Sequence, residues 1–140
     1  MEKLVSWIQT LPSDQIRLSD IGVLCARKAD VKRVKEALQS AQIKTVILDA
    51  GADDRSTLGV RVTTMHRAKG LEFFAVAIPF MSASSFPPQG ALMAAVDAAD
   101  REDIIIQYRS LLHVAATRAK KALLVLWSGE PTNIMNVPGN

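Results

Sequence analysis

The stretch from Val60 to Phe74 (VRVTTMHRAKGLEFF) holds the side chains of this sequence that are best suited to chemistry. It opens with β-branched residues typical of a buried strand, and then brings together His66, Arg67, Lys69, Gly70 and Glu72. Open α/β sheets place their ligands at the carboxyl ends of strands. A glycine there lets backbone N–H groups approach an anion closely. The stretch therefore predicts a strand that delivers a polar, anion-binding turn at its carboxyl end.

Two segments of the sequence resemble a known family. Thr64 to Phe73 (TMHRAKGLEF) resembles motif V of the UvrD/Rep-type superfamily 1 DNA helicases, whose pattern is T-x-H-x-A-K-G-L-E-F. Downstream, Arg109 to Lys121 (RSLLHVAATRAKK) resembles motif VI, whose pattern is R-x-L-L-Y-V-A-x-T-R-A-K. The two motifs occur in the family's order, and a less specific likeness covers residues 21–128.

The sequence departs from the family's pattern at four places. His113 stands at the usual tyrosine of motif VI, and Gln107-Tyr108 replaces the acidic pair that often precedes its arginine. The family's frequent arginine after the first apolar strand falls on Ala26. Only Asp49–Gly59 occupies the place where the best-known members carry a large accessory domain, so the chain resembles the shorter branch. None of these departures touches Thr117-Arg118-Ala119, the part of motif VI that matters for phosphate.

The resemblance implies the second RecA-like motor domain of a helicase. Its fold would be α/β: a three-layer, P-loop-NTPase-type arrangement with a mostly parallel sheet of about five strands and helices on both faces. The implied cofactor is ATP with Mg²⁺, bound between this domain and the N-terminal RecA-like domain of the same full-length chain. The Mg²⁺ ligands are expected on that N-terminal domain.

Three residues would reach the nucleotide by this resemblance. Arg118 would be the catalytic arginine finger, since its planar fork can grip phosphate oxygens and such a finger is worth about 10³–10⁵ in rate. Gly70 would be a backbone donor near the γ-phosphate, and Glu72 would accept a hydrogen bond from the ribose. Without the motifs, the same residues would be a solvated helix-end cation, a turn glycine and an exposed glutamate.

The resemblance also implies DNA, single- and double-stranded, as a partner. Thr64 and His66 would contact the phosphates of a single strand, as backbone-tracking channels do. Lys69 and Arg67 would add electrostatic attraction or bridge to the partner domain. Aromatic residues make up only 5% of the chain and do not alternate with basic ones, so a base-stacking platform is expected mostly elsewhere.

Two ATPase motifs are missing from the sequence. It contains no G-x-x-x-x-G-K-[ST] loop to cradle the β-phosphate, and no Asp-Glu pair at a strand end to hold Mg²⁺. The chain is therefore expected to be an excised C-terminal fragment that does not hydrolyse ATP on its own. One alternative is a non-catalytic module, derived from a helicase, that binds nucleic acid or a partner. An unrelated α/β nucleotide-binding or receiver-like domain is another, but receiver domains need an acidic cluster at their strand ends, which Leu48-Asp49 alone does not supply.

Strands and helices alternate along the sequence. Apolar runs predict strands at 21–26, 44–48, 60–64, 74–79 and 123–127, and periodic patterns predict helices at 2–11, at 30–41 and from about 100 to 121. The second of these helices would be capped by Asp30. Residues 68–72 have room for one helical turn, 82–90 read as a loop, and 91–99 are ambiguous. The expected organisation is a helix and connector at 1–20, the RecA-like domain at 21–130 and a loose tail at 131–140.

Composition and charge fit a single globular domain. The 140 residues are 49% hydrophobic and 22% charged, with a net charge of +3 and a pI near 9.2, which permits a nucleic-acid partner without requiring one. The single Cys25 lies in an apolar run, which predicts a buried, unreactive thiol. No apolar run approaches the roughly 20 residues of a membrane helix, so no membrane partner and a cytoplasmic location are expected.

Overall fold

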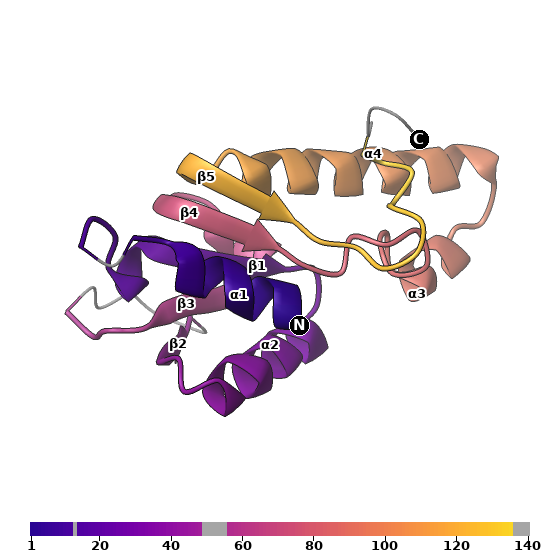
Figure 1. Ribbon diagram of the computed structural model, residues 1–140. Coiled ribbons are helices and arrows are strands. Elements are labelled where there is room, and N and C mark those ends of the chain that lie inside the picture. The colour runs from indigo at the N-terminus through magenta and orange to yellow at the C-terminus, as the bar shows by residue number, and fades with distance from the viewer. Residues whose placement is uncertain (13, 49–55, 136–140) are drawn as a thin grey trace.

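The computed structural model describes residues 1–12, 14–48 and 56–135, and these form a parallel α/β sheet flanked by helices (Figure 1). The strands are β1 (Ile21–Cys25), β2 (Thr45–Ile47), β3 (Val60–Thr64), β4 (Phe73–Ile78) and β5 (Ala119–Val125). All neighbouring pairs are parallel, in the order β2-β3-β1-β4-β5. The helices are α1 (Glu2–Thr10), α2 (Lys28–Ser40), α3 (Gln89–Met93) and α4 (Ala98–Ala116), with 3₁₀ turns η1 (Leu18–Asp20) and η2 (Met65–Ala68).

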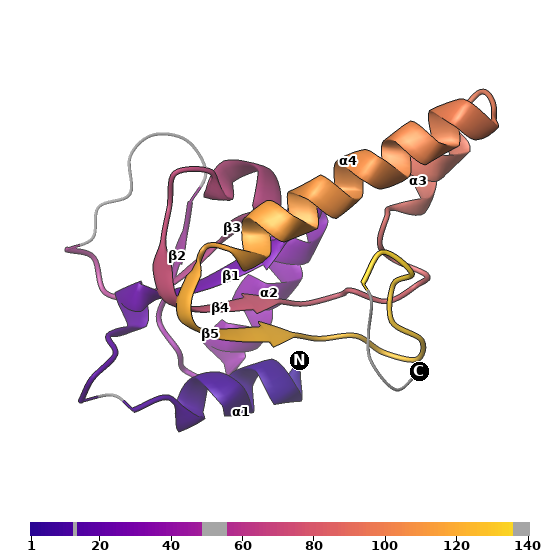
Figure 2. The ribbon, with the colours of Figure 1, turned by 90° about the horizontal axis from the view of Figure 1, so that it is seen from above.

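Two apolar clusters on opposite faces of the sheet give the three layers that the resemblance implied. Alternate residues of a strand face opposite sides. Val23 and Cys25 of β1 therefore pack with α1 and α2, whereas Leu24 packs with η2 and α4. Figure 1 shows α4 on one side of the sheet and α1 and α2 on the other. The first half of α4 projects beyond the sheet in Figure 2, with α3 beside it.

The strands at 21–26, 60–64 and 74–79 and the helix at 2–11 are confirmed to within about one residue. Two other predictions were wrong at the end of the domain. The helix predicted to run to about 121 ends at Ala116, and Lys120 and Lys121 belong to β5. The last strand, predicted from its apolar run at 123–127, begins at Ala119, and β5 is the outer strand of the described sheet with Leu123 46% exposed.

The structure also bears on three local expectations. The turn expected at 68–72 forms earlier, as η2. The ambiguous segment 91–99 contains the end of α3 and the start of α4, where Asp97 caps the helix by accepting from the Asp100 backbone N–H at 2.7 Å. The tail was expected to be loose, yet Thr132 is buried and its hydroxyl donates to the Phe86 carbonyl at 2.5 Å. Residues 49–55, within the Asp49–Gly59 segment that stands in place of the accessory domain, and residues 136–140 of the tail lie outside the described residues.

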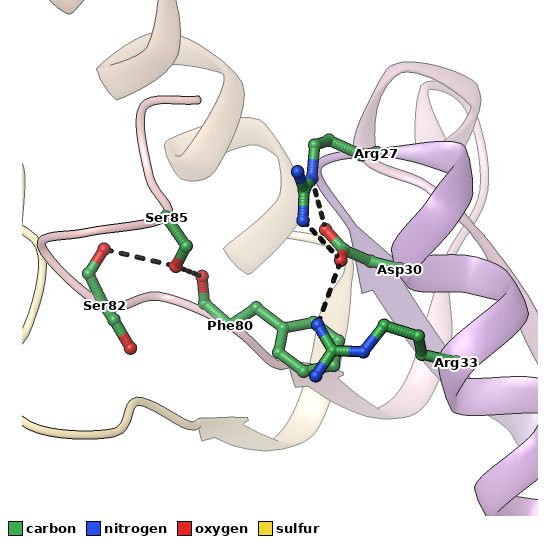
Figure 3. Close-up of polar contacts among 6 residues, drawn as sticks. All are labelled: Arg27, Asp30, Arg33, Phe80, Ser82 and Ser85. Atoms are coloured by element: carbon green, nitrogen blue, oxygen red, sulfur yellow. Dashed lines mark hydrogen bonds and ion pairs between the residues drawn. The ribbon is translucent and has the colours of Figure 1, made fainter. Parts of the chain in front are cut away.

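The helix cap assigned to Asp30 is wrong, because α2 begins at Lys28 with Arg27 at its N-cap. Asp30 instead lies in the first turn with a side chain only 3% exposed. Arg27 donates from Nε and Nη2 to its two carboxylate oxygens at 3.0 and 2.9 Å, and Arg33 Nη1 lies 3.6 Å away (Figure 3). The hydrogen bond from Arg27, and then the charge of Asp30, raise the pKa of the Arg27 guanidinium. A buried carboxylate is thus compensated by two arginines.

Arg33 also connects α2 to the segment after β4. The Arg33 guanidinium lies 4.3 Å from the centroid of the Phe80 ring. Phe80 has a left-handed backbone (φ 64°), and the Ser85 hydroxyl donates to its carbonyl at 2.7 Å. Figure 3 shows this chain of contacts from Arg27 to Ser85. The carboxyl ends of β1 and β4 are therefore tied together through Asp30 and Arg33.

We expect Asp30→Asn to lower the free energy of unfolding by about 1–3 kcal/mol, because it weakens a charge-assisted pair at a buried position. Urea unfolding followed by circular dichroism measures the change. The matched control is Asp103→Asn on the exposed surface of α4, which should stay within about 0.5 kcal/mol of the unsubstituted chain. Equal stability of the two variants would contradict the role given to Asp30.

Candidate functional site

Gly70, Glu72 and Arg118 lie at one edge of the sheet, and we call them the amino-end cluster. Glu72 immediately precedes β4 and Arg118 immediately precedes β5, the neighbouring parallel strand. The Phe73 backbone N–H donates to the Arg118 carbonyl at 2.9 Å, which joins the two strand starts. Glu72 and Arg118 are therefore brought together, with Gly70 two residues before Glu72, while the roles of the three residues stay predictions.

Gly70 has a left-handed backbone conformation. Its φ is +80°, a conformation that favours glycine, and a Cβ built there would meet no atom within 4 Å. The space beside it is therefore open, and a substitution would be strained by the backbone rather than by a neighbour. Gly70 is available for close approach of a ligand to the main chain.

The Arg118 guanidinium is folded back onto the end of α4. Its Nε donates to the Val114 carbonyl at 3.1 Å, and Nη2 lies 3.3 Å from the Thr117 hydroxyl. The Val114 carbonyl belongs to the last turn of the helix, where carbonyls lack a partner further along the helix. Arg118 thus caps α4 in this conformation, and reaching a phosphate would require it to leave Val114.

Glu72 contacts a lysine at the same edge. Lys120 Nζ lies 3.5 Å from Glu72 Oε2, and the two side chains are 59% and 65% exposed. An ion pair at this exposure contributes little stability and exchanges readily. A hollow of about 380 Å³, bordered also by Arg17 and Asp20, lies beside the pair. The carboxylate of Glu72 is therefore accessible to a hydrogen-bond donor.

The single turn predicted at the carboxyl end of the 60–64 strand is divided between two edges of the sheet. Thr64 ends β3 at the carboxyl edge, as predicted, but Gly70 and Glu72 lie at the opposite edge. The reason is topological: β4 is parallel to β3, with β1 between them, so residues 65–72 must cross back over the sheet. Buried Met65 and Ala68 pack this crossover beneath α4.

The three predicted DNA contacts also separate. Thr64 lines a hollow of about 320 Å³, here called the lysine hollow, between α2 and the ends of β2 and β3. His66 and Lys69 line a different hollow of about 310 Å³, between η2 and α4, that includes Tyr108 and Leu111. Thr64 is therefore in one hollow and His66 and Lys69 are in another, although the sequence predicted one group of DNA contacts.

Sequence reasoning missed Lys28, Lys32 and Lys35, which line the lysine hollow beside Thr64. Their i, i+4, i+7 spacing places them on one face of a helix, and this signal was present in the sequence. The spacing alone did not reveal which strand ends they would face. Arg67, considered only as a general cation, borders the same hollow.

The single cysteine is buried and free. Burial raises the pKa of the Cys25 thiol, with a further contribution from the charge of Asp30, which agrees with the predicted unreactive cysteine. Within residues 1–12, 14–48 and 56–135, no group of three or more His, Cys, Asp or Glu side chains could hold a metal ion. Over the same residues, no helix has the length and apolar character needed to cross a membrane.

Comparisons with known proteins agree with this architecture. Residues 50–130 match the family described as the UvrD-like helicase C-terminal domain. A solved structure described as the C-terminal domain of a possible DNA helicase from Lactobacillus (strain WCFS1) superposes with a TM-score of 0.68 at 17% identity. The superposition covers 95% of this chain and 69% of that one. Comparison with curated protein sequences gives no match. Because the family match spans more than half of its residues, the chain belongs to the UvrD-like helicase C-terminal domain family.

Proposed function

We propose that this chain is the second motor domain of an ATP-dependent DNA helicase, which completes the ATP site and contacts single-stranded DNA. The observation that carries the proposal is the amino-end cluster. Glu72 belongs to the first motif, as does Gly70, and Arg118 to the second, yet Glu72 and Arg118 meet where β4 and β5 begin. Such an edge can close on a nucleotide that a first RecA-like domain holds.

The cluster's chemistry suits phosphoryl transfer. The guanidinium of Arg118 would leave the Val114 carbonyl and stabilise the charge that develops on the transferred phosphoryl group. Glu72 would exchange Lys120 for a ribose hydroxyl, which a weak exposed pair permits. ATP with Mg²⁺ would be held chiefly by the first domain, because this sequence has no loop of the G-x-x-x-x-G-K-[ST] type.

The crossover at residues 65–72 offers a physical link between the two activities. Thr64, at its start, would contact DNA phosphates at the carboxyl edge, with His66 and Lys69 farther along. Gly70 and Glu72, at its end, would contact ATP at the amino edge. Because buried Met65 and Ala68 hold the segment against the sheet, closure on ATP would move the DNA contacts with it. Hydrolysis could thereby drive translocation and strand separation.

We expect Arg118→Ala, made in the helicase that carries both motor domains, to lower DNA-stimulated ATPase turnover by about 10³–10⁵. Arg118→Lys should recover only part of this loss, since lysine cannot bind phosphate oxygens bidentately. Lys121→Ala, which removes an exposed cation from β5, is the control and should remain near normal. Near-normal turnover by Arg118→Ala would dispose of the finger role and favour a non-catalytic binding module.

Glu72→Ala should raise the KM for ATP by roughly tenfold. This factor corresponds to the weak end of the range for hydrogen bonds to charged groups, which we choose because the Glu72 carboxylate is well exposed. The specific measurement compares the KM values of Glu72→Ala and the unsubstituted protein for ATP and for 2′,3′-dideoxy-ATP, which lacks the ribose hydroxyls. If Glu72 accepts from the ribose, the variant and the unsubstituted protein should have equal KM values for the dideoxy nucleotide. A penalty of the same size with both nucleotides would assign Glu72 another role.

A further inference from the structure

The amino edge of the sheet continues beyond the amino-end cluster to a third strand. β4 lies between β5 and β1 and all three are parallel, so their starts form one row (Figure 2). The register pairs Ile21 of β1 with Ala75 of β4. The turn η1 ends at Asp20, directly before β1, and contacts β4. Asp20 therefore lies on the other side of Glu72 from Arg118.

The hollow of about 380 Å³ beside Glu72 occupies this end of the row, and we call it the η1 hollow. Its volume lies within the range of about 300–1,000 Å³ that is usual for small-molecule sites. Phe74 is half-buried there and packs against the core below. The lining combines this aromatic ring with polar and charged groups: Arg17, Ser19, Asp20, Glu72, Phe74 and Lys120. Such a hollow suits a flat ring with hydrogen-bonding groups at its edge.

Asp20 presents a hydrogen-bond acceptor to the η1 hollow. Its Oδ2 accepts from the Arg17 backbone N–H at 3.2 Å. Within the part of the chain that the structure describes, Oδ1 has no hydrogen-bond partner. The residue is half-buried, so water competes less for this oxygen than for a fully exposed one. Asp20 is therefore suited to recognise an N–H donor of a ligand.

The order of side chains along the row matches the order of groups in a nucleotide. The proposed function places the transferred phosphoryl group at Arg118 and the ribose at Glu72, on neighbouring strand starts. The base follows the ribose, and the next strand start in the same direction is that of β1, roughly 5 Å further on. The η1 hollow lies there, with Phe74 in its lining.

We propose that the η1 hollow receives the nucleobase and that Asp20 selects adenine over guanine. The inference rests on the proposed function, because it requires the ribose at Glu72. Adenine carries an amino donor at the position where guanine carries a carbonyl acceptor. The Asp20 carboxylate accepts a hydrogen bond from adenine, whereas guanine would set two acceptors against each other. Arg17 stacks its planar guanidinium on either purine.

The test is binding of AMP-PNP and GMP-PNP, two non-hydrolysable triphosphates, to the helicase that carries both motor domains. Isothermal titration calorimetry gives the two dissociation constants. Asp20→Asn keeps an acceptor for the Arg17 N–H and presents an amide donor to the base. The ratio of the constants should therefore shift toward GMP-PNP by about tenfold, the weak end of the range for hydrogen bonds to charged groups. The shift isolates Asp20, because the first domain is the same in both proteins.

The matched control is Asp14→Asn, the same substitution at an exposed position of the same connector, outside the lining of the hollow. It should leave the ratio unchanged. Asp20→Ala, which removes the acceptor without adding a donor, should shift the ratio in the same direction as Asp20→Asn but less far. Arg17→Ala should weaken both analogues alike, by about two- to fivefold, as expected for an exposed cation–π contact. Circular dichroism melting confirms that each variant is folded.

The outcomes separate this inference from the proposed function. A shift confined to the two Asp20 variants supports base selection by Asp20. An unchanged ratio in both of them, with both analogues still bound, overturns the inference and leaves the proposed ATP site standing. Equal weakening of the two analogues by Asp20→Asn also overturns it, because a general loss carries no base preference. If the unsubstituted helicase binds neither analogue, the proposed ATP site fails and base selection fails with it.

Discussion

The crossover between β3 and β4 is the constraint on which the rest of the molecule depends. Two parallel strands separated by β1 require the chain to return across the sheet, and here it returns in residues 65–72. A segment this short has no room for a long helix, so it lies flat under α4 and buries Met65 and Ala68. Its two ends therefore present polar groups at opposite edges, which allows one motif to serve two ligands.

The core keeps these edges in fixed register. Gly22 of β1 has no side chain where the Phe73 ring packs, and a Cβ there would come within 2.7 Å of that ring. The absent side chain lets Phe73, which is 1% exposed, sit against the sheet directly after Glu72. The Phe73 backbone N–H then donates a hydrogen bond to the Arg118 carbonyl. Packing of one glycine against one aromatic ring thus fixes the spacing between two motifs distant in the sequence.

Much of the fold and part of the site were predictable from the sequence. The strands β1 and β4 are uninterrupted apolar runs, β3 is rich in β-branched residues, and the helicase motifs named Gly70, Glu72 and Arg118. The end of α4 was not predictable, because Ala115 to Lys121 is rich in helix formers and only pairing with β4 makes its second half a strand. Asp30 was assigned to a cap because the sequence pattern placed the start of the helix two residues too late, whereas α2 begins at Lys28 and holds Asp30 in its first turn between Arg27 and Arg33. Which edge of the sheet a residue occupies depends on the strand order, and the residue types around it do not show that order.

The last strand has a consequence for how this chain behaves at high concentration. In the described part of the chain, β5 has a neighbour only on its β4 side, so its outer hydrogen-bonding groups form a template for a further strand. Leu123 adds exposed apolar surface to that template. Lys120 and Lys121, the second and third residues of β5, are both exposed. If β5 of a second copy paired with this edge, these lysines would add like charges to the interface. These lysines therefore act as gatekeepers against self-association.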